Sequence, residues 1–408
     1  MSKKSPQLRF EGFTDDWEER KLGSLTTVVR GASPRPIQDP KWFDKESDIG
    51  WLRIADVTEQ NGRIYHLEQH ISKLGQEKTR VLTEPHLLLS IAATVGKPVV
   101  NYVKTGVHDG FLIFLNPTFE REFMFQWLEM FRPKWQKYGQ PGSQVNLNSE
   151  LVRNQEIVLP NYKEQQKIGS FFKQLDNTIT LHQRKLDLLK EQKKGYLQKM
   201  FPKNGEKVPE LRFAGFADDW EERKLSSIAE RVTRKNKNNE STLPLTISAQ
   251  DGLVDQNDYF NKQVASRDVT GYFLVKNGEF AYNKSYSNGY PWGAIKRLDK
   301  YEMGVLSTLY IVFKPTAINS QFLVSYYETT RWYREVSKNA AEGARNHGLL
   351  NISPNDFFNT LLTIPKSAEE QQQIGSFFKQ LDDTIALHQR KLDLLKEQKK
   401  GFLQKMFV

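Results

Sequence analysis

Two long segments of this chain are nearly identical, and they frame two stretches that differ. Residues 164–201 read EQQKIGSFFKQLDNTITLHQRKLDLLKEQKKGYLQKMF and residues 370–407 read EQQQIGSFFKQLDDTIALHQRKLDLLKEQKKGFLQKMF, so only four of 38 positions change. A shorter pair recurs ahead of each insert, LRFEGFTDDWEERKL at residues 8–22 and LRFAGFADDWEERKL at residues 211–225. Neutral drift after a duplication would have blurred these repeats as well as the inserts. We therefore interpret the repeats as a frame for an invariant partner and the inserts as readers of different targets.

Each long repeat has the pattern of a helix that packs along one seam. Good helix formers dominate it, and the seam positions alternate in steps of four and three. Pro160 and Pro202 bracket the first repeat, as a helix start and stop do. His182 and His388 interrupt the seams, and we assign them to fixing the register or to contacting a partner, because the sequence offers no carboxylate or imidazole neighbours for a metal or acid–base role. The positions expected to form the seam are Leu175, Ile179, His182, Leu186, Leu189, Leu381, Ile385, His388, Leu392 and Leu395.

The order of the segments predicts how the two helices run. The first insert precedes the first helix, and a short segment after Phe201 leads directly into the second insert. To bury its own seam against the first helix, the second helix must run antiparallel to it. We expect an α+β fold in which two α/β domains are joined by two long antiparallel coiled-coil helices with pseudo-two-fold symmetry. The helices would form a rod of roughly 50 Å with one domain at each end.

The two inserts share a faint skeleton. LIFLNPTFEREFMFQWLE at residues 112–129 resembles YIVFKPTAINSQFLVSYYE at residues 310–328, and both read as a buried strand, a proline turn and a helix with an apolar face. Lys97 and Lys104 flank a predicted hairpin in the first insert. We expect one common fold with two different surfaces. The expected segments are residues 1–161 (first domain with its boundary segment), 162–201 (first long helix), 202–366 (linker, boundary segment and second domain) and 367–408 (second long helix).

The composition limits the kind of protein. Hydrophobic residues at 38% indicate globular domains, and 59 Lys and Arg against 49 Asp and Glu give a net charge of +10, which suits a polyanionic partner. The absence of cysteine excludes disulfides and thiolate metal sites. The sequence has no long apolar run and no secretion signal, so we expect a cytoplasmic protein that contacts no membrane. It also lacks a phosphate-binding loop, an adenine-methyltransferase signature and metal-ligand spacings, so nothing indicates an enzyme, a bound cofactor or a metal.

The most specific pieces of the sequence precede the two helices. Residues 157–168 follow the pattern I-V-L-P-x-x-x-E-Q-Q-K-I, and residues 363–374 follow T-I-P-x-x-x-E-E-Q-Q-Q-I. Over its whole length the chain resembles the specificity subunit of a Type I restriction–modification system. The resemblance implies two target recognition domains that each read half of an asymmetric, split DNA site, with the helices as the ruler between them.

The same resemblance implies partners. Two methyltransferase subunits would dock on the helices, carry S-adenosylmethionine and methylate adenine, and motor–nuclease subunits would join for restriction. This chain would itself be non-catalytic and hold no cofactor. A separation of about one turn of B-DNA, roughly 34 Å, between the two domains agrees with a split site.

Candidate DNA contacts are loops that combine cations for phosphates with amides, hydroxyls and forked donors for base edges. In the first domain they are Arg30, Arg35, Lys97, Lys104, Lys137, Tyr138, Gln140, Ser143 and Gln144. In the second domain they are Arg234, Lys235, Lys237, Asn238, Lys284, Ser285, Tyr286, Arg345, Asn346 and His347. Any single one of these loops is also compatible with an ordinary solvated surface.

Two other functions stay open at this point. The chain could be a scaffold that pairs proteins through its helices and never reads DNA, which would give a flat binding profile over many DNA sequences. It could also be a stand-alone nuclease or methyltransferase, which the missing motifs disfavour and an assay without partners would decide.

Overall fold

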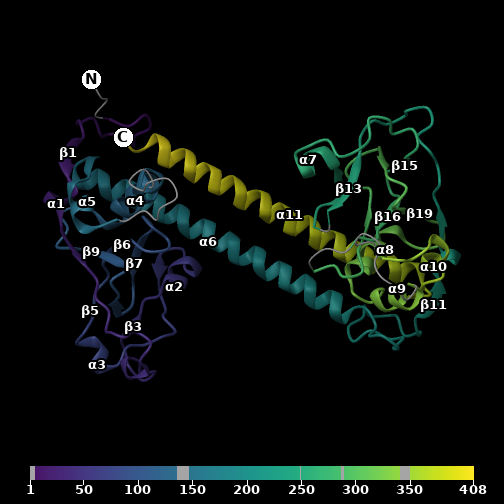
Figure 1. The fold of residues 1–408 in the computed structure, drawn as a ribbon, viewed down its shortest axis with the longest axis horizontal. Coiled ribbons are helices and arrows are strands. Elements are labelled where there is room, and N and C mark those ends of the chain that lie inside the picture. Colours follow the sequence, from purple (N-terminus) through teal and green to yellow (C-terminus); the bar gives the residue numbers. More distant parts are fainter. Residues whose placement is uncertain (1–4, 136–146, 249, 286–288, 341–349) are drawn as a thin grey trace. The chain divides into compact units, whose positions relative to one another are not determined.

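The chain folds into two compact units, each containing one insert and one end of both long helices. The computed structural model describes all residues except 1–4, 136–146, 249, 286–288 and 341–349 (Figure 1). Unit 1 comprises residues 1–184 and 390–408, and unit 2 comprises residues 185–389. The four segments expected from the sequence keep each helix whole, whereas the compact units divide both helices near their middle.

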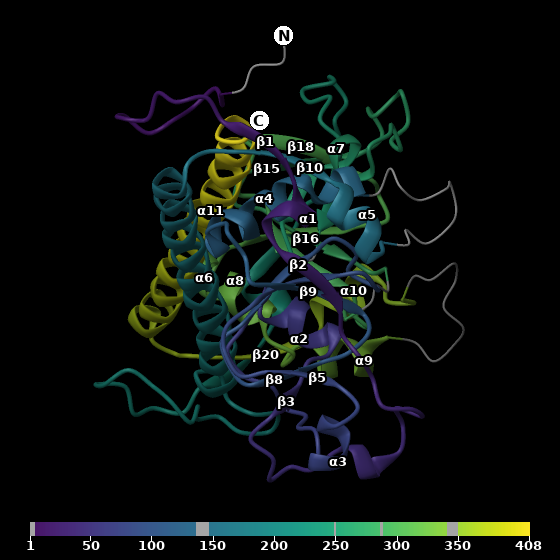
Figure 2. The ribbon, with the colours of Figure 1, turned by 90° about the vertical axis from the view of Figure 1, so that its left-hand side faces the viewer.

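Unit 1 is built on a five-stranded sheet in the order β2-β9-β6-β7-β4, with a three-stranded sheet β3-β8-β5 and a strand pair β1-β10. Figure 2 faces this unit, with β2 beside β9. The strands are β1 Glu18–Lys21, β2 Thr27–Arg30, β3 Gly50–Trp51, β4 Arg63–Ile64, β5 Arg80–Leu82, β6 Leu87–Ser90, β7 Pro98–Asn101, β8 Thr105–Val107, β9 Phe111–Leu115 and β10 Glu156–Leu159. The shorter helices are α1 Leu22–Leu25, η1 Pro40–Trp42, α2 Ile54–Glu59, α3 Lys73–Gln76, α4 Arg121–Trp135 and α5 Ser149–Asn154.

Unit 2 is built on a four-stranded sheet in the order β12-β19-β16-β17, with the strand pairs β13-β14, β15-β18 and β11-β20. The strands are β11 Glu221–Lys224, β12 Ala229–Arg231, β13 Leu245–Ser248, β14 Gly252–Asp255, β15 Phe273–Lys276, β16 Phe280–Asn283, β17 Ala294–Arg297, β18 Met303–Leu306, β19 Ile311–Pro315 and β20 Leu361–Ile364. The shorter helices are η3 Leu225–Ser227, α7 Gln256–Phe260, α8 Ser320–Glu328, α9 Tyr333–Asn339 and α10 Pro354–Phe358.

The two domains share the skeleton expected from the sequence. The expected strand, turn and helix are β9 and α4 in unit 1 and β19 and α8 in unit 2. The pairing of β6 with β9 places Leu88 opposite Ile113, and the pairing of β16 with β19 places Ala281 opposite Val312. Ile113 lies ten residues before Phe123 of α4, and Val312 lies ten residues before Phe322 of α8. The central strands of the two sheets are therefore paired in the same register, which the divergent sequences alone did not establish.

The prediction of a hairpin between Lys97 and Lys104 is wrong. β7 pairs with β6 and β4, whereas the next strand, β8, pairs with β3 and β5 in another sheet. The fully buried amide of Asn101, at the end of β7, donates to the main-chain oxygens of Glu84 and Val103 (both 3.1 Å). These bonds hold the chain where it leaves one sheet for the other, and the three-residue separation of the strands along the sequence did not reveal this.

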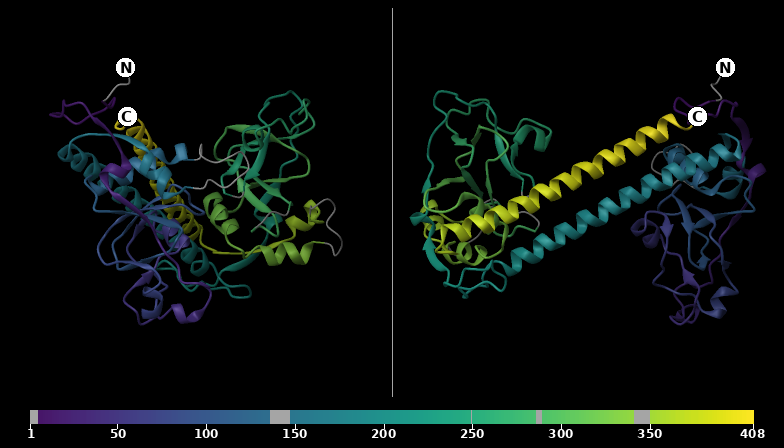
Figure 3. Two further views of the ribbon diagram at one scale, coloured as in Figure 1. Left: turned by 60° about the vertical axis from the view of Figure 1, so that its left-hand side comes forward. Right: turned by 180° about the vertical axis from the view of Figure 1, so that it is seen from behind.

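The two repeats form the long helices α6 Tyr162–Lys199 and α11 Ala368–Lys405. Within each unit their segments pack antiparallel (Figure 3). In unit 1 the rings of Phe171 and Phe402 lie 5.1 Å apart, and in unit 2 those of Tyr196 and Phe377 lie 5.0 Å apart. All ten seam positions are buried or partly buried. Leucines on the opposite side, such as Leu181, are exposed.

The end of each helix completes the core of a domain. In unit 1, Phe407 lies 5.3 Å from Phe123 of α4, and in unit 2, Phe201 lies 5.7 Å from Phe322 of α8 (ring centroids). The boundary segments cap the same ends, because the amide of Leu8 donates to Lys405 O and the amide of residue 211 to residue 199 O (both 2.9 Å). The C-terminus therefore belongs to the core of the first domain, beside the N-terminal segment (Figure 2).

Candidate nucleic-acid and partner-binding sites

A buried ion pair links the short and the long repeat in each unit. In unit 1, Arg9 donates two hydrogen bonds of 2.7 Å to the fully buried carboxylate of Glu164. In unit 2, Arg212 does the same to Glu370 at 2.7 and 2.8 Å. The hydrogen bond to Glu164 raises the pKa of Arg9, which favours the charged guanidinium. The two repeats are therefore one physical frame.

The glutamine that follows each glutamate joins the frame to the insert. The Gln165 side chain accepts from the amide of Glu120 (2.9 Å) and donates to Pro160 O (2.8 Å). Gln371 accepts from the amide of Asn319 and donates to Pro365 O (both 2.9 Å). These side chains bind only main-chain atoms of the inserts, so the insert sequence can change around an unchanged frame.

Two glycines of the frame allow the insert helices to approach closely. A Cβ atom added at Gly169 would lie 2.8 Å from the amide nitrogen of Phe123 in α4. One added at Gly375 would lie 2.6 Å from that of Phe322 in α8. By contrast, Gly195 and Gly401 have nothing within 4 Å among the described residues. The glycines that permit close approach are therefore those of the I-G-S-F-F motif.

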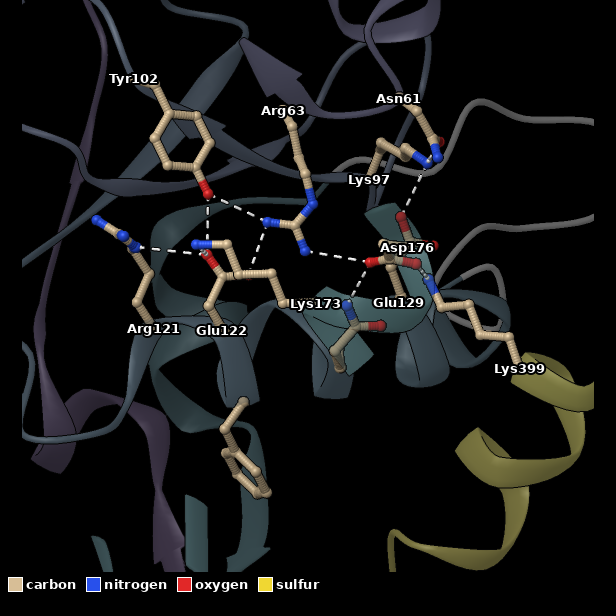
Figure 4. Close-up of polar contacts among 12 residues, drawn as sticks. Asn61, Arg63, Lys97, Tyr102, Arg121, Glu122, Glu129, Lys173, Asp176 and Lys399 are labelled. Carbon is tan, nitrogen blue, oxygen red and sulfur yellow. Dashed lines mark hydrogen bonds and ion pairs between the residues drawn. The ribbon is translucent and has the colours of Figure 1, made fainter. Parts of the chain in front are cut away.

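Unit 1 contains a buried polar cluster that the sequence did not reveal (Figure 4). Arg63 of β4 pairs with Glu122 of α4 at 2.6 Å and with Asp176 of α6 at 3.1 Å. Asp176 also accepts from Gln126 at 2.7 Å and pairs with Lys399 of α11 at 2.6 Å. We call Arg63, Glu122, Gln126, Asp176 and Lys399 the Asp176 cluster. Because its charges are compensated within the cluster, it joins the first domain to both helices without leaving a buried charge.

Unit 2 contains the corresponding frame pair with a different insert residue. Lys193 of α6 and Asp382 of α11 occupy the repeat positions of Lys399 and Asp176 and lie 2.5 Å apart (Nζ to Oδ1). Lys193 also pairs with Glu328 of α8 at 2.7 Å. Burial would lower the pKa of Lys193, but the two carboxylates outweigh it and the pKa is raised. We call these three residues the Lys193 cluster.

The candidate loop at the end of β2 is gathered around Asp109. Arg30 donates to Asp109 O (2.6 Å), and Arg35 pairs with the Asp109 carboxylate (2.5 Å) while 71% of the Arg35 side chain remains exposed. Burial would raise the pKa of Asp109, but the hydrogen bond from Ser33 and the charge of Arg35 outweigh it and the pKa is lowered. Asp109 thus holds the two arginines on one surface, Arg30 through its main-chain oxygen and Arg35 through its ionised carboxylate.

The other two candidate cations that the structure describes in the first domain, Lys97 and Lys104, are in ion pairs. Lys97 binds Asn61 and Glu129, both at 2.8 Å, with 14% of its side chain exposed. Lys104 pairs with Asp48 at 2.6 Å with half of its side chain exposed. Lys97 therefore joins the sheet to α4, whereas Lys104 remains accessible to a phosphate. Lys137, Tyr138, Gln140, Ser143 and Gln144 lie outside the described residues.

In the second domain the predicted basic loop is partly structural. Arg234 donates to both oxygens of Glu279 at 2.8 Å, and Lys235 lies over the Phe273 ring with its Nζ 4.3 Å from the centroid. Lys237 and Asn238 are exposed. The tip of this loop is therefore presented to solvent by ion-paired and packed residues at its base.

The other candidates of the second domain lie at the end of β16. Lys284 donates to Ile352 O (3.3 Å), and burial lowers the pKa of its ammonium. Ser285 is partly buried, and its amide is bound by the side chain of Asn283 (3.0 Å). Tyr286, Arg345, Asn346 and His347 lie outside the described residues.

The comparison with known families gives the decisive observation. The profile of the Type I restriction modification DNA specificity domain matches this chain twice, at residues 14–191 and 217–397. The chain belongs to this family. Each specificity domain, as the family profile defines it, covers one insert and most of the long helix that follows.

Known relatives agree with the family over nearly the whole chain. The Type I restriction enzyme MjaVIII specificity subunit of Methanocaldococcus jannaschii is 20% identical, covering 95% of this chain and 91% of the relative. The crystal structure of the S subunit from the Type I restriction–modification system of M. genitalium superposes with a TM-score of 0.62 at 14% identity, covering 99% of both chains. A structure from work on assembly and conformational transition of the type I R-M system gives a TM-score of 0.50 at 15% identity, covering 96% and 97%. At these identities the structural likeness concerns the fold.

Among the described residues, no group of three or more histidines and acidic residues is placed to hold a metal ion. No helix in the described ranges is long and apolar enough to cross a membrane.

Proposed function

We propose that this chain is a DNA-binding specificity subunit that recognises a bipartite, asymmetric DNA sequence. Each domain reads one half-site, and the chain directs methyltransferase and restriction subunits to that site. The observation that supports this most is that two different domains are attached in the same way to two nearly identical helices. In both units a helix Glu binds the boundary segment and the next Gln binds the main chain of the insert. A frame of this kind holds interchangeable readers.

The exposed polar groups support a nucleic-acid partner. Loops of the two domains present three solvent-accessible cations, Arg35, Lys104 and Lys237, and one amide, Asn238. The chain carries a net charge of +10. Cations of this kind position a protein on phosphates, and amides read base edges. The two domains present different groups, so the two half-sites would differ.

The outer sides of the helices support a protein partner that binds twice. Leu181 and Leu188 of α6 are 67% and 62% exposed, and the repeat positions in α11, Leu387 and Leu394, are 59% and 58% exposed. A spacing of seven places each pair on one helix face. Because the same apolar pair occurs in both copies, we assign it to two copies of one methyltransferase subunit, which would bring S-adenosylmethionine. Motor–nuclease subunits would join this complex in the cytoplasm.

The test is methylation mapping of a host that expresses this chain with its methyltransferase partner. The expected result is one split adenine-methylated sequence with an unread spacer. Exchanging residues 26–160 for the insert of another family member should change one half-site only. A complex that methylates no split site, or an exchange that alters both halves, would refute the proposal. A flat DNA-binding profile of the complex would instead favour a scaffold.

A further inference from the structure

Unit 2 contains a pocket of about 650 Å³ between α6 and the second specificity domain. This volume is within the range of small-molecule sites in proteins. Apart from one glutamate, Glu328, its charged lining is cationic: Lys190, Lys193 and Lys194 of α6, Lys296 of β17, and Arg331. Glu328 is already paired with Lys193. The pocket is therefore suited to an anion.

Two polar groups in the wall of this pocket have no hydrogen-bond partner among the described residues. One is the hydroxyl of Tyr327, a residue that is only 7% exposed. The other is the partly buried ammonium of Lys296, which Glu328 and Asp382 attract without forming a hydrogen bond or a close ion pair with it. An unpaired buried hydroxyl is costly. A ligand that accepts hydrogen bonds would satisfy both groups.

The first domain has apolar residues at both positions. In the second domain Lys296 of β17 lies opposite Ala281 of β16. In the first domain Leu88 is the equivalent of Ala281, and Val99 of β7 lies opposite it. Val99 is therefore the equivalent of Lys296. Counting along the helices from the equivalent Phe123 and Phe322, Leu128 corresponds to Tyr327. Val99 and Leu128 are fully buried. The lysine and the tyrosine are thus features of the second domain and not requirements of the fold.

Aromatic side chains also line the pocket. Tyr290 and Tyr333 line it and are partly buried, and Trp332 packs against Tyr333 with a ring separation of 4.6 Å. Base rings stack on such side chains, and cations bind the attached phosphate. We propose that this pocket binds a nucleotide, with its phosphate on Lys296 and Tyr327 and its base against the tyrosines. The nucleotide is either free in solution or part of a DNA strand, and the site does not depend on DNA sequence recognition.

The test uses the full chain and three variants: Lys296→Met, Tyr327→Phe, and Lys300→Met as a control that removes an exposed lysine of the same unit. ATP binding is measured by calorimetry, and binding of a mixed-sequence duplex is measured as a function of salt. Lys296→Met should lower the affinity for the ligand that occupies the pocket about tenfold or more, and Tyr327→Phe should lower it several-fold. Each substitution removes one hydrogen bond to a charged group. Tyr327→Phe should not lower the melting temperature, because the hydroxyl has no partner in the free protein.

Three outcomes are distinguishable. One-to-one ATP binding that both variants weaken, with DNA affinity unchanged, identifies a free nucleotide. Absence of ATP binding, with weaker duplex binding by both variants and a salt slope reduced by about one in Lys296→Met, identifies a DNA phosphate. If neither ligand responds to the two variants beyond the Lys300→Met control, the proposal is overturned, whatever the outcome of the methylation mapping.

Discussion

The Asp176 cluster of unit 1 and the Lys193 cluster of unit 2 start from the same lysine–aspartate pair of the frame and are completed with opposite charges. In unit 1 the insert supplies the cation Arg63, which approaches the frame aspartate at 3.1 Å. In unit 2 the insert supplies the anion Glu328, which approaches the frame lysine at 2.7 Å. An identical frame therefore accepts different domains because each domain brings a charge for one member of the pair.

The difference extends to neighbouring positions. Arg63 also pairs with Glu122, whereas in unit 2 the equivalent helix position is Gln321, which accepts from Arg297 at 2.7 Å. The first domain thus has a buried ion pair where the second has a neutral amide. The polar contacts that both units share use main-chain atoms of the insert, and the polar contacts that differ use its side chains. This separation lets the inserts vary without loss of docking.

The largest expected effect tests which end of each helix belongs to which domain. Phe407→Ala should destabilise unit 1 by about 3–5 kcal/mol, because the ring is buried against Phe123 and Phe172. Phe201→Ala should do the same to unit 2. Hydrogen exchange resolved by peptide would measure each unit separately. Equal losses in both units from either change would contradict the assignment.

The next effect sharpens the contrast between the charge clusters. Arg63→Met should lower the free energy of unfolding of unit 1 by about 3–5 kcal/mol, because it leaves Glu122 and Asp176 short of a buried cation. Arg297→Met is the matched control, and we expect a loss of about 1 kcal/mol, because its partners are neutral or exposed. Denaturant unfolding measures both. Similar losses would mean that the buried ion pairs of Arg63 stabilise unit 1 no more than the contacts of Arg297 stabilise unit 2.

A smaller effect distinguishes two glycines of the same helix. Gly375→Ala should destabilise unit 2 by about 1–3 kcal/mol, because the added methyl group meets the main chain of α8. Gly401→Ala should stabilise α11 by up to about 1 kcal/mol, because its surroundings are open. Thermal unfolding of the two variants would settle the sign. A loss for Gly401→Ala would point to a contact that the free chain does not show.

The smallest expected effect on stability concerns the exposed leucines. Leu188→Glu and Leu394→Glu should change the free energy of unfolding by no more than about 0.5 kcal/mol, as surface changes usually do. Copurification of the methyltransferase partner should nevertheless fall sharply. Leu8→Glu, at a 41% exposed leucine in a boundary segment, is a control. Normal partner binding by both helix variants would exclude this face.

The features that could be predicted from the sequence are those that produce a periodic or repeated pattern of residues. The near-identity of the repeats and their four-and-three spacing were enough for both long helices, and residues 112–129 for the strand, turn and helix of the first domain. The sheet order and the Asp176 cluster were not predictable, because Arg63, Glu122 and Asp176 lie far apart in the chain and meet only through tertiary packing. One signal was available: an arginine repeated in the short segments and a glutamate in the long ones implied a partner for each.

The order in which the chain connects the two units is circular, apart from one break between its two ends. α6 leaves unit 1 and ends in the core of unit 2, α11 returns from unit 2 and ends in the core of unit 1, and Leu8 binds Lys405 at the break. The segment at residues 203–207 holds the equivalent position in unit 2 as a covalent link. Opening the chain there, and joining the present ends with a short linker, would preserve every contact described above. Which of the two domains comes first in the polypeptide is then a matter of where this circular order is cut, and not of how the protein folds.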